Sequence, residues 1–525
     1  MNRKTLLLLI LLPGPFVLNG QAKLRKMPPN INHTSVNNYA PFLSLDGNAM
    51  AYVADVAEDN VLTLCYATRD GVNWNDPVIL PKTINTRLNF LKGYGLSSDG
   101  RTLYISSSRT NGMGGFDLYT SQFNGTSWTE PVNMLLPANS KGNEASASLS
   151  LDGTMMFYMR CDKMDFSKAD NCKIMMMMKK SNGQWDAPVE LPVSINTGNS
   201  QSPRIMGDGE TLLFSSNKIQ PSKGGMDLYY SKLINNQWSS PLPLDFANTP
   251  TDDQYVSASS IGRYLVKDVK GQRTNELIEM LFPIEIRPKA TVKIEGSITG
   301  LDDPSSAFVS VFSLKDQKQV FSTKPGKDGI FVSYLKEGGL YDLSVDPAKD
   351  NYTFFSKTYD LTGEKFPLTE KVSVALKPAG VGDEIALDGI SFNPGTSELA
   401  SSSTQELRRL TRLIKGNPDK FFSIMITLAG YQKDSVRSNP DLTEIHIDTL
   451  RFPVTYKIDS VTIGKRDSLI LKITYHNNRT LKQAKAIGHY LLSQGIAPNK
   501  ISQSGKAQEE AVLEKRKTYV TVIIP

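Results

Sequence analysis

Four segments of similar sequence, each built around a tryptophan, recur in the first half of the chain. In each, a proline follows three residues after the tryptophan: Trp74 to Val78, Trp128 to Val132, Trp185 to Val189 and Trp238 to Leu242. Each is preceded, 28 to 33 residues earlier, by an Asp-Gly pair that begins at Asp46, Asp99, Asp152 or Asp208. A period of this size is typical of stacked or radial repeats, whose surfaces favour binding over catalysis.

The sequence of each repeat predicts short strands separated by turns. Asp-Gly between alternating apolar residues predicts a hairpin, because glycine adopts the positive φ of a tight turn. Segments 102–106 and 211–215 match closely, and a weaker fifth copy spans 257–267. Four short strands per unit predict a β-propeller of about five blades, in which ring closure removes the edge strands. We expect the chain before Asp46 to lend a strand that closes the ring.

These repeats resemble the WD40-like, TolB-type propeller repeats (PD40) of exported bacterial proteins, over residues 21–286. The four tryptophans are expected to pack between blades and the four aspartates to shape the turns. The alternative is that the tryptophans stack on carbohydrate.

The first 20 residues have the pattern of a signal peptide. Basic residues at 3 and 4 precede the apolar run 5–12, and Gly20 offers a cleavage point. No later stretch is long and apolar enough to span a bilayer, so the mature chain is expected to be exported and without a transmembrane segment. The net charge of +6 is small for 525 residues, and no basic run carries interleaved aromatics. This argues against nucleic acid as a partner.

The third repeat contains two cysteines and a cluster of methionines. Cys161 and Cys172 flank a polar loop, so a hairpin could bring them into a disulfide; the alternative is two free thiols. Eight methionines lie between Met155 and Met178, and soft sulfur ligands suit Cu(I). Successive residues of a strand alternate faces, so we interpret these methionines as core-filling and predict no metal and no cofactor.

Residues 287–378 show strands without the tryptophan period, and Asp328-Gly329 precedes one of them. This segment resembles the β-sandwich of carboxypeptidase regulatory-like domains, which implies a spacer without an active site.

In residues 379–525 the sequence pattern changes and predicts an α/β fold, with helices and strands in alternation. A strand is expected to end at 390–392, Ser401 to Ser403 to cap a helix at 404–415, and Gly495 to end a second helix near 480–494. The run from Gln483 to Ile496 resembles the OmpA-like (Pal-like) domain, which binds peptidoglycan.

That resemblance implies a pocket that grips the zwitterion of diaminopimelate with an aspartate and an arginine. Here Gly430 to Lys433 replaces the aspartate segment, and Gln483 stands at the arginine position. Asp434 could take the place of the family's aspartate if the loop is shifted by one residue. The pocket-equivalent residues are Tyr431, Lys433, Asp434, Thr480, Gln483 and Arg516.

About 40 residues, 435–475, are inserted where the family has a short loop. They alternate apolar and polar side chains, which predicts a β-hairpin or small sheet able to pair with another chain.

No Gly-x-Ser-x-Gly elbow occurs, and the four histidines have no metal spacing, so we predict that the protein is not an enzyme. The domain order resembles that of Bacteroidetes OmpA-family envelope proteins, some of which serve secretion or gliding machinery. We therefore expect a periplasmic scaffold whose propeller binds proteins and whose tail docks to an outer-membrane assembly or to peptidoglycan. The alternatives are an authentic peptidoglycan anchor and a carbohydrate-binding propeller.

Overall fold

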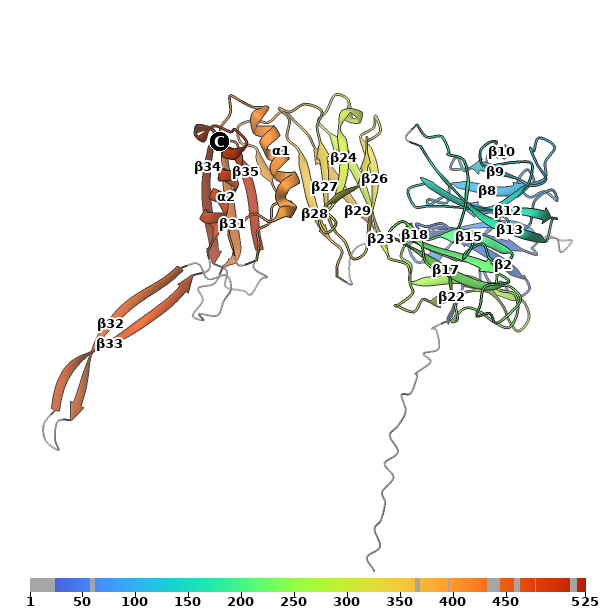
Figure 1. Ribbon diagram of the computed structural model, residues 1–525, viewed down its shortest axis with the longest axis horizontal. Helices are drawn as coiled ribbons and strands as arrows, with labels where there is room; N and C mark the ends of the chain where they lie inside the picture. Colours follow the sequence, from blue (N-terminus) through green and yellow to red (C-terminus); the bar gives the residue numbers. More distant parts are fainter. Residues whose placement is uncertain are drawn as a thin grey trace, which may run out of the picture. The chain divides into compact units, whose positions relative to one another are not determined.

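The computed structural model describes residues 24–56, 62–180, 182–363, 369–394, 396–431, 444–457, 463–476, 478–509 and 517–525 (Figure 1). The chain divides into two compact units, Met1–Thr291 and Val292–Pro525. The predicted signal peptide and the candidate site residues Lys433, Asp434 and Arg516 lie outside the described residues. None of the described helices is long and apolar enough to cross a membrane.

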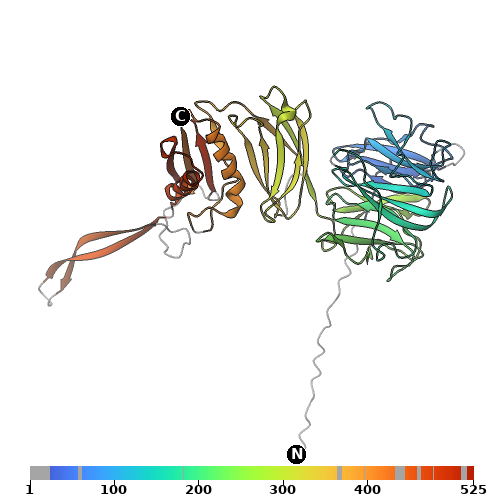
Figure 2. The ribbon, with the colours of Figure 1, turned by 45° about the horizontal axis from the view of Figure 1, so that its top comes forward.

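The first unit consists of five small antiparallel sheets, the blades of a β-propeller (Figure 2). Blade 1 contains β2 (Asn38–Leu43), β3 (Ala49–Ala54), β4 (Thr63–Asp70), β5 (Asn73–Trp74) and β6 (Val78–Ile79). Blade 2 contains β7 (Gly95–Leu96), β8 (Thr102–Ser107), β9 (Asp117–Gln122) and β10 (Val132–Asn133). Blade 3 contains β11 (Asn143–Leu149), β12 (Met155–Met164), β13 (Ala169–Met178) and β14 (Val189–Glu190). Blade 4 contains β15 (Ser200–Ile205), β16 (Thr211–Ser216), β17 (Asp227–Ile234), β18 (Gln237–Trp238) and β19 (Leu242–Pro243).

Blade 5 is assembled from both ends of the propeller sequence. It contains β20 (Val256–Ala258), β21 (Tyr264–Lys270), β22 (Asn275–Leu281) and the N-terminal β1 (Leu24–Lys26), which pairs antiparallel with β22. The amide of Leu43 donates to Ser257 Oγ at 2.9 Å, which joins blade 1 to blade 5. The five-bladed fold and its closure by the N-terminal chain are therefore confirmed.

The Asp-Gly pairs form the turns between the first two strands of blades 1 to 4. In blade 1 the Asp46 carboxylate accepts hydrogen bonds from Ser44 Oγ at 2.6 Å and from the amide of Asn48 at 3.0 Å. Asp99 and Asp152 make the equivalent bonds, and the glycine that follows each of the four aspartates has φ between +63° and +77°. A side-chain acceptor next to a left-handed glycine fixes the turn locally, which is why the sequence signal is strong.

Each tryptophan packs against the neighbouring blade. Trp128 of blade 2 meets the Tyr66 ring of blade 1 edge-on at 5.2 Å, and Trp238 of blade 4 meets Phe157 of blade 3 at 5.8 Å. Trp185 packs on a core shared by blades 2 and 3, and Trp74 on one shared by blades 1 and 5. The rings thus fill the space between sheets, where edge-to-face aromatic contacts add to burial.

The second unit begins with a β-sandwich. One sheet has the order β26 (Ile330–Lys336), β23 (Thr291–Thr299), β29 (Thr369–Ala375). The other has the order β25 (Lys318–Thr323), β24 (Phe308–Ser313), β27 (Leu340–Asp346), β28 (Phe355–Asp360), with the short helix η1 (Pro304–Ser306) between β23 and β24. Alternating apolar side chains of both sheets form one core, which includes Ile294, Val311 and Leu343.

The same unit continues into an α/β fold with the sheet order β30 (Glu384–Ala386), β35 (Lys517–Ile523), β31 (Phe422–Tyr431), β34 (Ile501–Glu509). The helices are η2 (Ser401–Ser403), α1 (Thr404–Lys415), α2 (Thr480–Ser493) and η3 (Pro498–Lys500). Phe354 of the sandwich segment belongs to the core of this α/β fold, so the sandwich and the α/β fold share one compact unit.

Two local predictions for the α/β fold were wrong. Ser401 to Ser403 form a turn of 3-10 helix and make no side-chain cap, because Ser403 instead exchanges hydrogen bonds with the backbone of Ser391. The first strand ends at Ala386, and Phe392 contributes only an isolated bridge to Leu399.

The inserted segment forms a two-stranded hairpin of β32 (Glu444–Lys457) and β33 (Ile463–His476). The strands pair along 14 residues each, from Glu444 opposite His476 to Lys457 opposite Ile463. Among the described strands they pair only with each other.

Candidate functional site

A pocket of the α/β domain lies beside the start of α2. Its cavity volume is about 320 Å³, and its lining includes Asn393, Leu428, Gln483 and Thr518. Gln483 comes from the first turn of α2, and Leu428 comes from β31 near the end of that strand. Gln483 is the predicted residue that the structure, in the part of the chain it describes, places in this lining.

Thr480 does not contribute to this lining. Thr480 is buried at the start of α2, where its hydroxyl donates to Asn478 Oδ1 at 2.7 Å. Tyr431 is the last residue of β31, and Lys433, Asp434 and Arg516 fall outside the described part of the chain.

Arg479 lines this pocket beside Gln483, and the sequence reasoning missed it. It immediately precedes α2, one helical turn before Gln483, which stands at the arginine position of the OmpA-like family. Residues four apart along a helix share one face, so a guanidinium at 479 can reach the space that one at 483 would occupy. The signal in the sequence was the Arg-Thr pair at the start of the predicted helix.

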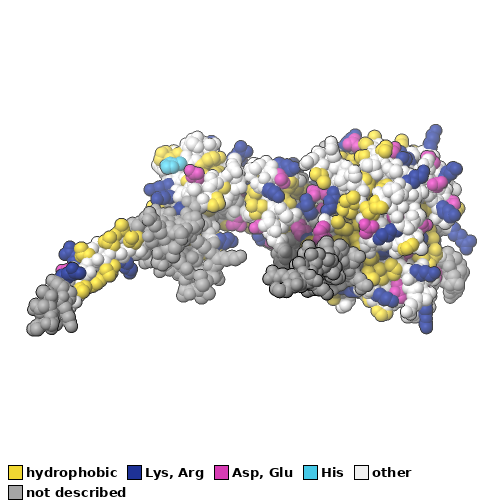
Figure 3. Space-filling model, turned by 60° about the horizontal axis from the view of Figure 1, so that its bottom comes forward, with side chains coloured by type: hydrophobic (Ala, Val, Ile, Leu, Met, Phe, Trp, Pro, Cys, Tyr) yellow, Lys and Arg dark blue, Asp and Glu magenta, His cyan; other side chains and the backbone are white. Residues whose placement is uncertain are grey.

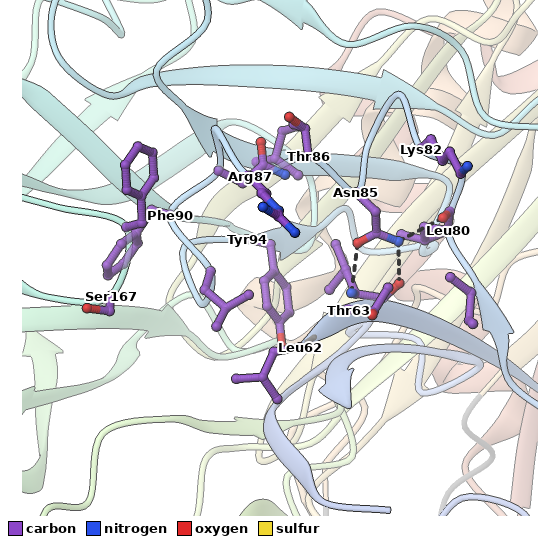
Figure 4. A pocket seen from close by; sticks show the side chains of 16 residues that line it. Leu62, Thr63, Leu80, Lys82, Asn85, Thr86, Arg87, Phe90, Tyr94 and Ser167 are labelled. Carbon is purple, nitrogen blue, oxygen red and sulfur yellow. Dashed lines mark hydrogen bonds between the residues drawn. The ribbon is translucent and has the colours of Figure 1, made fainter. Parts of the chain in front are cut away.

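The propeller carries a larger pocket at blades 1 and 2, with a cavity volume of about 970 Å³ (Figure 4). Buried Phe90, Tyr94 and Ile105 contribute to its lining, and exposed Lys82 and Arg87 lie in the same lining. Asn85 fixes the loop before blade 2, since its side chain exchanges hydrogen bonds of 2.8 and 3.0 Å with the backbone of Leu64. The pocket therefore has a rigid apolar base with cationic side chains around it.

The hairpin of blade 3 contributes to the same pocket. Its tip residue Phe166 meets the Phe116 ring at 5.5 Å, and the Phe166 carbonyl accepts a hydrogen bond from the Leu91 amide at 3.2 Å. Cys161 and Cys172 face each other across β12 and β13 and form a disulfide. The disulfide thus closes the hairpin that carries Phe166 to the pocket.

The methionine cluster of blade 3 divides between two interfaces. Met156, Met175 and Met177 belong to the core shared with blade 2, whereas Met155 and Met176 pack on the core shared with blade 4. The methionines therefore fill two separate blade interfaces, and both nearby cysteines are used in the disulfide. In the part of the chain that the structure describes, no three His, Cys, Asp or Glu side chains gather to hold a metal ion.

The β32–β33 hairpin exposes apolar side chains on both faces. The exposed fractions of these side chains lie between 37% and 61%: Ile447, Leu450, Phe452, Leu469, Ile470, Leu471 and Ile473. Paired residues share a face, so Leu450 with Ile470 lies on one face and Ile447 with Ile473 on the other. The space-filling view shows hydrophobic side chains along the hairpin (Figure 3). Both outer edges keep main-chain groups without a strand partner among the described residues.

No family model matches the chain, and no curated protein matches it. Solved propeller structures do match, among them a putative TolB from Agrobacterium tumefaciens at 15% identity, covering 57% of this chain and 90% of that chain with a TM-score of 0.29. An endo-arabinase from Bacteroides thetaiotaomicron matches at 14% identity, covering 48% of this chain and 96% of that chain with a TM-score of 0.34. An alpha-L-arabinofuranosidase from Lactobacillus brevis matches at 15% identity, covering 49% and 94% of the two chains with a TM-score of 0.31. Likeness at this level does not extend to activity or ligand, and the propeller assignment rests on the sheet topology.

Proposed function

We propose that the protein is a non-enzymatic scaffold of the bacterial cell envelope that joins two partners. The propeller binds one protein, and the C-terminal α/β domain docks on an outer-membrane assembly. The observation that carries this proposal is the β32–β33 hairpin, which exposes seven large apolar side chains and has two outer edges that pair with no other described strand. An isolated two-stranded hairpin is at best marginally stable in water, so a hairpin of this length gains most from a partner strand.

The proposed docking mode is strand addition. A partner strand that pairs with β32 or β33 would satisfy the edge main chain and cover part of the apolar rows. The signal-peptide pattern and the resemblance to OmpA-family proteins of Bacteroidetes support the periplasmic face of the outer membrane as the location. The same resemblance supports a role in secretion or gliding machinery.

The propeller pocket supports the second binding surface. It combines an apolar base with cationic side chains, as protein-recognition sites often do. The tryptophans favour this over carbohydrate binding, because their rings pack between blades.

Peptidoglycan anchoring is the second candidate for the tail, and Arg479 is the observation that favours it. A guanidinium beside Gln483 can hold a ligand carboxylate in the pocket even though the aligned arginine is absent. In this candidate function, peptidoglycan is the partner of the tail and the hairpin serves another purpose.

The experiment that tests the scaffold is site-specific photo-crosslinking in envelopes. A photoreactive residue at Leu471 should capture one defined envelope protein, whereas the same residue at Val72, an exposed apolar position of the propeller, should not capture that protein. When the photoreactive residue is moved to a neighbouring position of the hairpin, replacing Leu450, Ile470 and Leu471 by lysine should abolish the capture of that envelope protein. Capture of the same protein from both positions, or of none from Leu471, would contradict docking by the hairpin.

A sacculus pull-down separates the two candidate functions. Retention of wild-type protein on purified sacculi, abolished by R479A and by free diaminopimelate, would identify a peptidoglycan anchor. No retention, together with capture at Leu471, is the result expected for the scaffold. The variant K482A, on the same helix but outside the pocket lining, is the matched control.

A further inference from the structure

Arg204 is a buried cation at the centre of the propeller. It belongs to β15, the innermost strand of blade 4, yet its guanidinium lies 4.1 Å from the centre of the Phe42 ring in β2 of blade 1. Blades 1 and 4 are not neighbours in a ring of five, so a contact between their innermost strands places the guanidinium on the propeller axis. The side chain of Arg204 is only 2% exposed.

The hydrogen-bonding capacity of Arg204 is largely unused. Nη1 donates to the Pro203 carbonyl at 2.9 Å, and Nε is buried without a hydrogen-bond partner. Among the described residues no carboxylate forms an ion pair with it. A buried charge without an anion is costly, and its burial lowers the pKa of Arg204 to about 10. The guanidinium therefore offers unused donors to an anion.

Lys92 contacts two aromatic rings near the same centre. Its ammonium is 5.2 Å from the centre of the Tyr39 ring and 5.1 Å from that of Tyr255, and the side chain is half-buried. Tyr255 also lies near Arg204, so both cations approach the same group of aromatic rings. Burial lowers the pKa of Lys92, and Asp268 acts against that shift.

Among the described residues, Asp268 is the acidic side chain that interacts with this cluster. Its carboxylate accepts a hydrogen bond from the Ala40 amide at 3.1 Å and interacts electrostatically with Lys92. Two cations against one carboxylate leave one excess positive charge. A centre with one excess positive charge and aromatic walls favours a monoanion over a strongly hydrated dianion such as phosphate.

Two further donors occupy the same level of the ring. Ser146 and Ser202 stand six residues before the Asp-Gly turns of their blades, the position that Ala40 has in blade 1. Both hydroxyls are buried without hydrogen-bond partners, and the Ala40 carbonyl accepts from the hydroxyl of Tyr94. Repeat-equivalent positions of innermost strands encircle the axis, so these hydroxyls lie around the centre that Arg204 enters.

We propose that the propeller axis is a binding site for a carboxylate, held by buried Arg204 and half-buried Lys92. Tyr39, Phe42, Tyr94 and Tyr255 supply aromatic walls for the apolar group that carries the carboxylate. The carboxylate belongs either to a small organic acid or to the end of a polypeptide. The site goes beyond the scaffold proposal and can fail or stand independently of it.

The test uses the full-length protein and two probes that differ only in charge, N-acetyl-phenylalanine and its amide. All four tryptophans lie in the propeller, so the tryptophan fluorescence follows this unit alone. The acid should bind in a fluorescence titration and raise the propeller melting temperature at constant ionic strength, whereas the amide should do neither. Equal effects of acid and amide would overturn the proposal.

Two variants should weaken binding of the acid, and a third should strengthen it. K92Q and R204Q should each weaken binding of the acid about tenfold or more, because each removes a charged donor. D268N should strengthen binding, because it removes the opposing carboxylate and keeps an oxygen that can accept from the Ala40 amide. If R204Q does not fold, K92Q and D268N still decide the question, since unchanged affinity in both contradicts the site.

A nonapeptide ending in a free phenylalanine carboxylate then identifies the source of the carboxylate. Binding at least as tight as that of the free acid indicates a polypeptide, and weaker binding indicates a small organic acid.

Discussion

Arg409 of α1 and Asp342 of β27 form a buried ion pair, with 2.7 Å between Nη1 and Oδ2. The same nitrogen lies 2.7 Å from Glu406 Oε2, and Glu406 in turn accepts a hydrogen bond from Ser356 of β28. The Arg409 guanidinium thus links a helix of the α/β fold to β27 of the sandwich, and Glu406 links the same helix to β28. The segment that the sequence predicted as a spacer is joined to the tail through buried charges.

Removing the guanidinium should destabilise the second unit strongly. In R409M, Glu406 and Asp342 remain buried without their cation, and we expect a loss of about 3–5 kcal/mol in the free energy of unfolding. Urea unfolding followed by far-UV circular dichroism measures the loss, while tryptophan fluorescence shows that the propeller transition is unchanged. The control is R412M, because Arg412 is 38% exposed and its pair with Asp346 should contribute less than about 1 kcal/mol. Equal losses in the two variants would contradict this role of Arg409.

The same cluster predicts an unusual pH dependence. Burial raises the pKa of Glu406 to about 7, above the ordinary glutamate value of 4.5. Between pH 4.5 and 7 the folded protein therefore holds a proton that the unfolded chain releases, so this residue's contribution to stability falls as the pH rises through that window. E406Q should flatten the dependence between pH 5 and 8 when unfolding of the second unit is followed by circular dichroism. An E406Q curve parallel to that of the wild type would rule out Glu406 as the titrating group.

The disulfide of blade 3 should stabilise the propeller. Cys161 and Cys172 are 11 residues apart, and closing a loop of this size is worth about 3 kcal/mol on chain-entropy grounds. The double variant C161S/C172S should lose most of this contribution to the free energy of unfolding, as measured by urea unfolding followed by tryptophan fluorescence. A reducing agent should destabilise the wild type by a similar amount and leave the double variant unaffected. Sensitivity of the double variant to reduction would assign the effect to another cause.

Gly95 on the innermost strand of blade 2 should not tolerate a side chain. A Cβ there would lie 2.0 Å from the Ala147 carbonyl oxygen of blade 3 and 3.1 Å from the Phe42 ring. G95A should therefore cost at least about 3 kcal/mol of propeller stability. G153A is the comparison, since Gly153 faces open space and its φ of +68° should cost only about 1 kcal/mol. The order of the two losses, measured by tryptophan fluorescence, tests the close approach of blades 2 and 3.

The sequence predicted the parts of the fold that local patterns encode. The Asp46 and Asp99 turns are fixed by hydrogen bonds within two residues, and α1 matches the apolar period of 404–415. The serines before α1 misled the prediction because Ser403 bonds to Ser391, a residue outside the local pattern. In the pocket of the α/β domain, alignment identified Gln483 but not Arg479, because a motif records position in the chain and not which side chain reaches a cavity.

By itself the sequence determined that the first unit is a ring of repeated blades, since the period of the tryptophans and the Asp-Gly turns depend only on short-range geometry. Only the tertiary structure decided which residues meet at the centre of the ring. The cation–π contact of Arg204 with Phe42 and the pairing of β1 with β22 join residues far apart in the chain. Such contacts form when the ring closes, and no local hydrogen bond or period within one repeat encodes them.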